Sequence, residues 1–160
     1  MKFRLVDRIL DWSPHTRIRG LKTVSFEEYS LKAAFGDEGW LPPSLLLESF
    51  LQLGNWLILL SSDFRQMGVV VKIGRVEFPG ALRLGETVQM DVTLRRGRED
   101  GFLLSGEGRV GSRTIINGLD CLAVPVPASD YVNPEDLRVL FSEICTPARK
   151  ESDDVASAQA

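Results

Sequence analysis

One carboxylate and two amide side chains recur at helical spacing within an otherwise apolar stretch, and they are the first candidates for chemistry. Glu48 is followed by Gln52 and Asn55, four and three residues further along the chain. With Ser44 and Ser62, they fall within roughly 80° of one another on an α-helix. The pattern is typical of a solvated strip or of hydrogen-bonded core side chains. It is equally typical of a pocket or a subunit interface, because a buried Glu needs a partner.

Histidine-based catalysis is limited to one position, because His15 is the only histidine in the sequence. It follows a Ser-Pro turn signal, and a lone histidine in a turn is usually exposed. Cys121 and Cys145 form neither a metal-like cluster nor a disulfide framework. We therefore expect no metal and no cofactor.

The composition indicates one ordinary globular domain. The chain has 160 residues, of which 44% are hydrophobic and 26% charged. Its formal net charge of -3 does not suggest a nucleic-acid partner. Lys2 and Arg4 interrupt the apolar start, so no signal peptide is evident and a cytoplasmic location is expected. We assign the domain to residues 1–145 and expect disorder in the polar tail, residues 146–160.

The candidate residues lie on a long helix that is predicted from Pro42 to Ser62. Leu, Ile, Phe and Trp occupy most of its positions, and a helix that is apolar all round is a buried one. Pro42 and Pro43 suit its first turn, where backbone amides have no intrahelical partner. The run is too short and too often interrupted for a membrane span, which needs about 20 apolar residues.

Strands are predicted on both sides of this helix in the sequence. They cover residues 3–12, 16–26, 69–78, 87–95, 102–110 and 114–126. Residues 87–95 alternate most clearly, with Val88, Met90, Val92 and Leu94 facing inward. A β-rich chain with one buried helix is an α+β pattern, in which an antiparallel sheet wraps the helix.

A short C-terminal helix is also predicted. Asn133 is a suitable cap, Pro134 a suitable first residue, and acidic residues follow at the positive end of the helix dipole. Phe141 and Ile144 lie on its apolar face, and we expect both to pack against the domain rather than face water.

Three segments carry a resemblance to a known family: residues 5–9 (LVDRI), the helix with Pro42, Leu45, Glu48 and Gln52, and residues 74–78 with 84–86. In this order and spacing, they resemble the FabA/FabZ-type 3-hydroxyacyl–acyl-carrier-protein dehydratases, which have the hotdog fold. The resemblance covers about residues 3–125. It implies a dimer in which each active site lies between subunits.

In the family that the chain resembles, three groups share the chemistry. A histidine of one chain removes the α-proton of the thioester, and a carboxylate on the other chain's helix helps the 3-hydroxyl leave as water. A glycine amide at the helix start binds the thioester carbonyl. By this resemblance, Glu48 is the catalytic carboxylate and Gln52 supports it.

Two of these three groups are replaced in this sequence. The histidine position falls on Ala34 and the carbonyl-binding glycine on Pro43. Alanine cannot accept a proton, and proline has no N–H to donate. Asp37 and Glu38 are alternative bases in the same loop. The substrate-binding residues that the resemblance implies are Ala34, Phe35, Trp40, Pro43, Ser44, Gly74 and Val76.

Three hypotheses stay open, and with them the question of whether the protein is an enzyme. The first is an acyl-thioester-binding hotdog protein of fatty-acid or polyketide-type metabolism without dehydratase activity of its own, or one half of a heterodimer. The second is a thioesterase or hydro-lyase with Glu48 as general base. The third is a structural or interaction module, which a tunnel closed by Trp40 or Trp56 would favour.

The acyl carrier and the oligomeric state are further expectations. The thioester is carried by CoA or by an acyl-carrier protein, which is acidic and would need a basic rim at the pocket mouth. Basic candidates are Lys72, Arg75, Arg83, Arg95, Arg96 and Arg98, which alternatively only keep the protein soluble. We expect a homodimer or heterodimer that buries more than about 2,000 Å² and places Glu48 near the partner subunit's Ala34 and Phe35.

Overall fold

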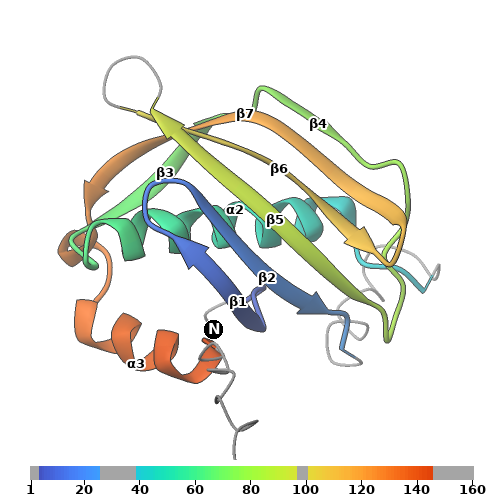
Figure 1. The fold of residues 1–160 in the computed structure, drawn as a ribbon, viewed down its shortest axis with the longest axis horizontal. Helices are drawn as coiled ribbons and strands as arrows, with labels where there is room; N and C mark the ends of the chain where they lie inside the picture. The colour runs from blue at the N-terminus through green and yellow to red at the C-terminus, as the bar shows by residue number, and fades with distance from the viewer. Residues whose placement is uncertain (1–3, 26–38, 97–100, 146–160) are drawn as a thin grey trace, which may run out of the picture.

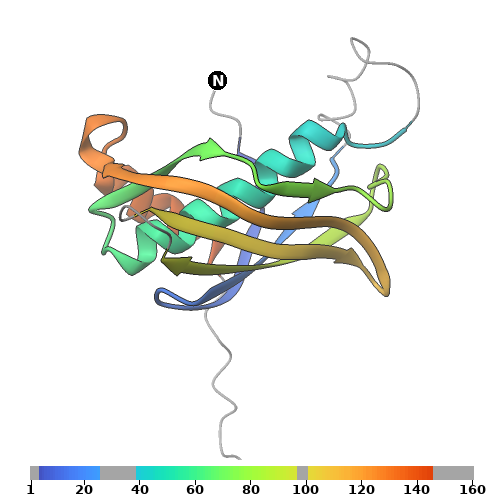
Figure 2. The ribbon, with the colours of Figure 1, turned by 90° about the horizontal axis from the view of Figure 1, so that it is seen from above.

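A computed structural model of the protein describes residues 4–25, 39–96 and 101–145. Its elements are β1 (Arg8–Ser13), β2 (Arg17–Thr23), α2 (Pro43–Ser61), β3 (Gln66–Lys72), β4 (Arg75–Glu77), β5 (Thr87–Arg96), β6 (Phe102–Val110), β7 (Arg113–Pro127), η2 (Ala128–Asp130) and α3 (Pro134–Ile144). The sheet curves around α2, as Figures 1 and 2 show from two directions. The α+β architecture predicted from the sequence is therefore confirmed.

All the strands belong to one antiparallel sheet with the order β1-β2-β5-β6-β7-β3, and β4 also pairs with β7. The predicted inward residues of β5 are confirmed, because Val88, Met90, Val92 and Leu94 are all buried. Alternation fixes which face of a strand is buried, so the register of β5 places these four side chains under α2.

The predicted strand over residues 69–78 is divided into β3 and β4. The division lies at Gly74, where a Cβ atom would stand 2.5 Å from the carbonyl oxygen of Leu119 and 2.7 Å from that of Asp120. Only a residue without a side chain fits so close to the neighbouring backbone. The pairing with β7 is also irregular between Val70 and Lys72. Local alternation in the sequence does not record this irregularity.

The helix α2 forms the centre of the hydrophobic core. Phe50, Leu53 and Leu57 are fully buried, and α2 contacts β2, β3, β5 and β6. By length and mean hydropathy alone this helix is able to cross a membrane, but 61% of its most apolar window is buried inside the structure. Packing against the sheet explains why this helix is apolar, because the core helix of a domain also buries most of its side chains.

The C-terminal helix packs against the C-terminal half of α2 and the turn that follows it. The Phe141 ring lies 6.1 Å from the rings of both Trp56 and Phe64, measured between centroids. Arg138 donates to the Asp63 carboxylate over 2.9 Å, and its guanidinium lies 4.6 Å from the centre of the Phe64 ring. The side chain of Asn133 caps α3 by accepting from the Glu135 amide. The predicted helix start and the packing of Phe141 and Ile144 are confirmed.

Gly118 tests how tightly α2 packs on the sheet. A Cβ atom there would lie 2.8 Å from a ring carbon of the buried Phe50. We predict that Gly118→Ala lowers the free energy of unfolding by about 1–3 kcal/mol, because overpacking strains the core. Chemical denaturation measures the change.

The matched control for this prediction is the double variant Gly118→Ala with Phe50→Leu. The smaller leucine removes the clashing ring, so the double variant should lose less stability than the two single losses added together. Strict additivity would contradict the proposed contact.

Candidate functional site

Glu48 and Gln52 form the centre of the candidate site on α2. The Gln52 amide nitrogen donates to the Glu48 carboxylate over 2.9 Å, and the Gln52 amide oxygen accepts from the Leu5 backbone N–H over 2.9 Å. Because the oxygen is committed to Leu5, the amide nitrogen is the atom that faces Glu48. The structure thus shows that the Gln52 amide holds the Glu48 carboxylate, and the catalytic support predicted for Gln52 stays a prediction.

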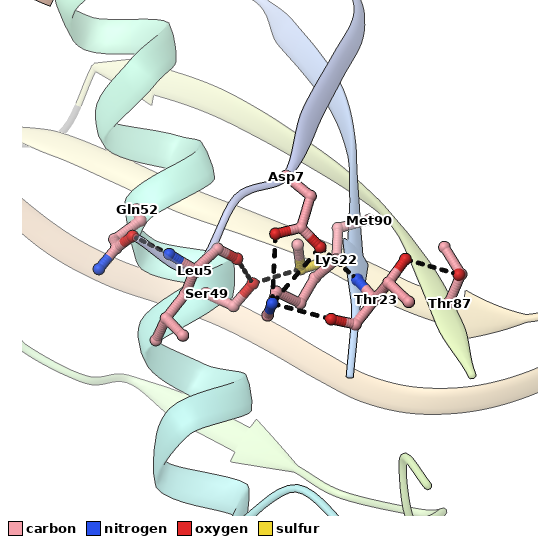
Figure 3. Close-up of polar contacts among 8 residues, drawn as sticks. All are labelled: Leu5, Asp7, Lys22, Thr23, Ser49, Gln52, Thr87 and Met90. Atoms are coloured by element: carbon pink, nitrogen blue, oxygen red, sulfur yellow. Dashed lines mark hydrogen bonds and ion pairs between the residues drawn. The ribbon is translucent and has the colours of Figure 1, made fainter. Parts of the chain in front are cut away.

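Ser49 ties the same N-terminal segment to the helix, as Figure 3 shows. Its hydroxyl is fully buried and donates to the Leu5 carbonyl oxygen over 2.5 Å. Both backbone polar groups of Leu5 are therefore satisfied by side chains of α2, one turn apart. Ser49 could not be identified from the sequence, because its partner is a backbone group 44 residues away.

A buried lysine lies close to this contact (Figure 3). The Lys22 ammonium group lies 3.2 Å from the Asp7 carboxylate and donates to the Thr23 carbonyl over 2.9 Å. Asp7 also accepts from the Thr23 N–H over 2.6 Å. Lys22 is only 2% exposed, and these partners offset the cost of burying its ammonium group. Lys22 was not among the predicted site residues, although alternation on β2 places position 22 on the inward face.

The polar stripe of α2 is partly a structural device. The Asn55 side-chain oxygen accepts from the Gly68 N–H over 2.7 Å, which ties β3 to the helix. Ser62 closes the helix end by bonding to the Leu59 carbonyl and the Gln66 backbone. The expectation that the stripe includes a buried Glu is wrong for the single chain, because Glu48 is exposed to solvent.

The first turn of α2 leaves a hydrogen-bond donor available. Among the described residues, no side chain caps this end of the helix, and Pro43 has no N–H. The amides of Leu45 and Leu46 donate to the Pro42 carbonyl. Within the described residues, the Ser44 amide has no acceptor, so it points to a carbonyl or anion site at the helix start.

The remaining predicted site residues are distributed around this end of the helix and the sheet. Trp40 is 43% exposed, and its backbone forms an isolated antiparallel β-bridge with Arg83. Pro43 is also exposed. Gly74 precedes β4. Val76 lies in β4 and pairs with Gly118 of β7. Ala34, Phe35, Asp37 and Glu38 lie outside the described residues.

Within one chain, His15 lies far from Glu48, and neither cysteine has an activated thiol. His15 is exposed in the β1–β2 turn, and its backbone N–H, not its ring, donates to the Ser61 hydroxyl over 2.8 Å. Ser61 is thirteen residues beyond Glu48, which is about 20 Å along a helix. Burial raises the pKa of the Cys121 thiol and also that of the Cys145 thiol, so both stay protonated and weakly nucleophilic near neutral pH.

Part of the predicted basic rim is already paired. Arg75 lies 2.6 Å from the Glu77 carboxylate, and Arg95 lies 2.6 Å from that of Asp120. Arg98 lies outside the described residues. Within the described chain, no group of three His, Cys, Asp or Glu side chains is arranged to hold a metal ion.

Comparisons with known proteins agree with this architecture. A FabA-like domain model matches residues 1–118. The chain is 29% identical over 114 residues to the 3-hydroxyacyl-[acyl-carrier-protein] dehydratase FabZ of Caulobacter vibrioides, a match that covers 69% of this chain and 72% of that one.

Solved structures show the fold. A hot-dog-like protein from Thermanaerovibrio acidaminovorans matches with a TM-score of 0.60 at 21% identity, covering 82% of this chain and 93% of that chain. The fluoroacetyl-CoA thioesterase FlK matches with a TM-score of 0.61 at 12% identity, covering 81% of this chain and 97% of that chain. The predicted hotdog fold is confirmed.

The hydrogen bonds of Gln52 predict different effects for two variants. Gln52→Ala removes the partner of the Leu5 N–H and should lower the free energy of unfolding by about 1–3 kcal/mol. Glu48→Gln should change it by less than about 0.5 kcal/mol, because Glu48 is exposed and a glutamine can still accept from Gln52. Urea denaturation of both variants checks this. Equal losses would mean that Gln52 does not hold the N-terminal segment.

Proposed function

This chain belongs to the family of proteins with a FabA-like domain, and from that membership we propose that it binds acyl thioesters in fatty-acid or polyketide-type metabolism. We further propose that it has no 3-hydroxyacyl dehydratase activity alone and works in the cytoplasm with a second hotdog subunit. The thioester is carried by CoA or by an acyl-carrier protein.

One observation carries this proposal: the helix retains an oriented carboxylate, while the chain lacks the histidine that would work with it. Gln52 holds Glu48 at 2.9 Å, and the aligned histidine position is Ala34. His15 lies near the other end of α2. General-base catalysis is typically worth about 10²–10⁴-fold in rate, so a site with Glu48 alone is a poor dehydratase.

The Ser44 amide supports the proposal that a thioester carbonyl binds at the helix start. It is a donor without an acceptor in the described chain, and it lies four residues before Glu48. It takes the place of the glycine amide that Pro43 cannot supply. Carbonyl binding is therefore retained in this proposal, whereas proton abstraction is not.

Within the described residues, β3 forms an unpaired edge of the sheet, and this edge supports the proposal of a partner subunit. β3 lies at one end of the strand order, and its outer residues Val69 and Val71 are 38% and 58% exposed. Ile73, which follows β3, is 43% exposed. Unpaired backbone groups beside apolar side chains are a hazard unless another strand covers them. A second hotdog subunit joined along β3 would cover them and bring its own loop toward Glu48.

The catalytic part of the proposal is tested by co-expression with a hotdog protein that has the histidine. We expect this chain alone to dehydrate 3-hydroxyacyl thioesters at least about 10²-fold more slowly than the mixed assembly, because it lacks the general base. Glu48→Gln in this chain should abolish the activity of the mixed assembly. Dehydration by this chain alone at ordinary rates would contradict the proposal.

The subunit contact is tested with Val71→Lys, which places a charge on the β3 edge. We expect the variant to weaken dimerisation at least about tenfold, because an ammonium group opposes strand pairing. Light scattering across a dilution series measures it. Val139→Lys is the matched control, because Val139 is 59% exposed but lies on α3. A wild-type monomer at micromolar concentration would rule out the shared site.

The second candidate is a thioesterase with Glu48 as the general base. It is favoured by the exposure and orientation of Glu48, which leave the carboxylate accessible to water. FlK, a thioesterase by name, shares the fold. Hydrolysis of acyl-CoA by the chain alone, lost in Glu48→Gln with the fold intact, would establish this activity in place of the first proposal.

A further inference from the structure

A pocket of about 200 Å³ lies between α2, the N-terminal segment (residues 4–7) and α3. We call it the α3 pocket, and Figure 1 shows α3 beside α2 and the N-terminal segment. Its wall from Val132 to Ile144 lies outside the FabA-like match, which ends at residue 118. Glu48 is not among the residues that line it. Gln52 does line it, so the α3 pocket adjoins the candidate site without including Glu48, and an inference about the pocket's own ligand goes beyond the proposed function.

The pocket arises from the way in which α3 is anchored. Arg138 and Phe141 hold the helix on Phe64 and Trp56. The neighbouring stripe of α3, at helical spacing, is then turned toward the N-terminal segment. Leu137, Leu140 and Ile144 on this stripe are only half-buried and line the pocket. Their uncovered apolar surface favours a hydrocarbon ligand.

The polar groups around the pocket are mainly hydrogen-bond donors. The side-chain oxygen of Asn55 is committed to the Gly68 N–H, and that of Asn133 caps α3. Each of these residues therefore presents its NH₂ group, for which the described chain offers no acceptor. Both residues line the pocket, so a ligand with an accepting oxygen would complete their hydrogen bonds.

The charged side chains around the pocket also favour a ligand with accepting oxygens. Arg4 lines the pocket and forms no ion pair within the described residues. Asp136, in the first turn of α3, is the opposing charge in the lining, and the positive end of the helix dipole favours it there. The unpaired guanidinium and the two amide groups together suit a carboxylate.

We propose that the α3 pocket binds a short aliphatic carboxylate, with its hydrocarbon chain against Trp56, Leu59 and Leu140. The carboxylate accepts from Arg4 and from the side-chain amides of Asn55 and Asn133. A cavity of about 150 Å³ holds benzene, so this pocket takes a ligand of about six to eight non-hydrogen atoms. Hexanoate, with eight such atoms, is the matching probe.

Calorimetric titration of the full chain with hexanoate and with 1-hexanol tests the proposal. The two probes share their hydrocarbon chain and differ in charge. We expect hexanoate to bind at least about tenfold more tightly than hexanol, as a charge-assisted contact requires. Arg4→Gln should remove this preference, and Asp136→Asn should increase the affinity for hexanoate.

Two further variants complete the test. Arg8→Gln is the matched control, because Arg8 is an exposed arginine of the same region that does not line the pocket, and it should bind hexanoate like the wild type. Leu140→Trp fills the pocket and should abolish binding of both probes. Equal binding of hexanoate and hexanol, or no binding of either, would overturn the proposal. An affinity for hexanoate that Arg4→Gln leaves unchanged would also overturn it. So would binding of hexanoate that Leu140→Trp leaves intact.

Discussion

The burial of α2 is the constraint on which the rest of the structure depends. Eleven of its nineteen residues are buried, and fully burying a single Leu or Phe side chain contributes about 1.5–3 kcal/mol. A sheet can cover only part of the circumference of such a helix. The curved sheet covers the side with Phe50, Leu53 and Leu57, and α3 covers Trp56. The C-terminal helix α3 thus helps to bury the part of α2 that the sheet does not cover.

Most of the fold could be predicted because it depends on local periodicity. Period-two alternation gave the inward face of β5, and the cap and proline at 133–134 gave the start of α3. The division between β3 and β4 could not be predicted in this way. It depends on the close approach of Gly74 to the backbone of β7, which is 45 residues further along the chain at Leu119.

The site was less predictable than the fold, because a polar side chain on α2 can either face a ligand or bind the backbone of a neighbouring segment. The helical spacing of the polar side chains was equally typical of hydrogen-bonded core residues and of a pocket or subunit interface. In the structure, Ser49, Gln52 and Asn55 bind the backbone of Leu5 and Gly68, because backbone groups beside an apolar helix need partners. Spacing alone cannot distinguish these roles, since the partners are distant in sequence. Within the described residues, the side chains of Glu48 and Ser44 are the members of the stripe that accept no backbone N–H, and both are exposed to solvent.

The geometry of the helix start also indicates what a partner subunit would have to supply. Ser44 and Glu48 are four residues apart, so the Ser44 amide and the Glu48 side chain are separated by about 6 Å along α2. In a 3-hydroxyacyl thioester, three bonds join the carbonyl carbon to the hydroxyl oxygen. A carbonyl held at Ser44 therefore brings the 3-hydroxyl toward Glu48 and leaves C2, which carries the α-proton, between them. One face of C2 is directed at α2, where Gln52 is already committed to Leu5 and Glu48. If the thioester binds in this way, a base that is not part of α2 would approach from the side away from the helix, where a second hotdog subunit would bring its loop in the arrangement proposed above.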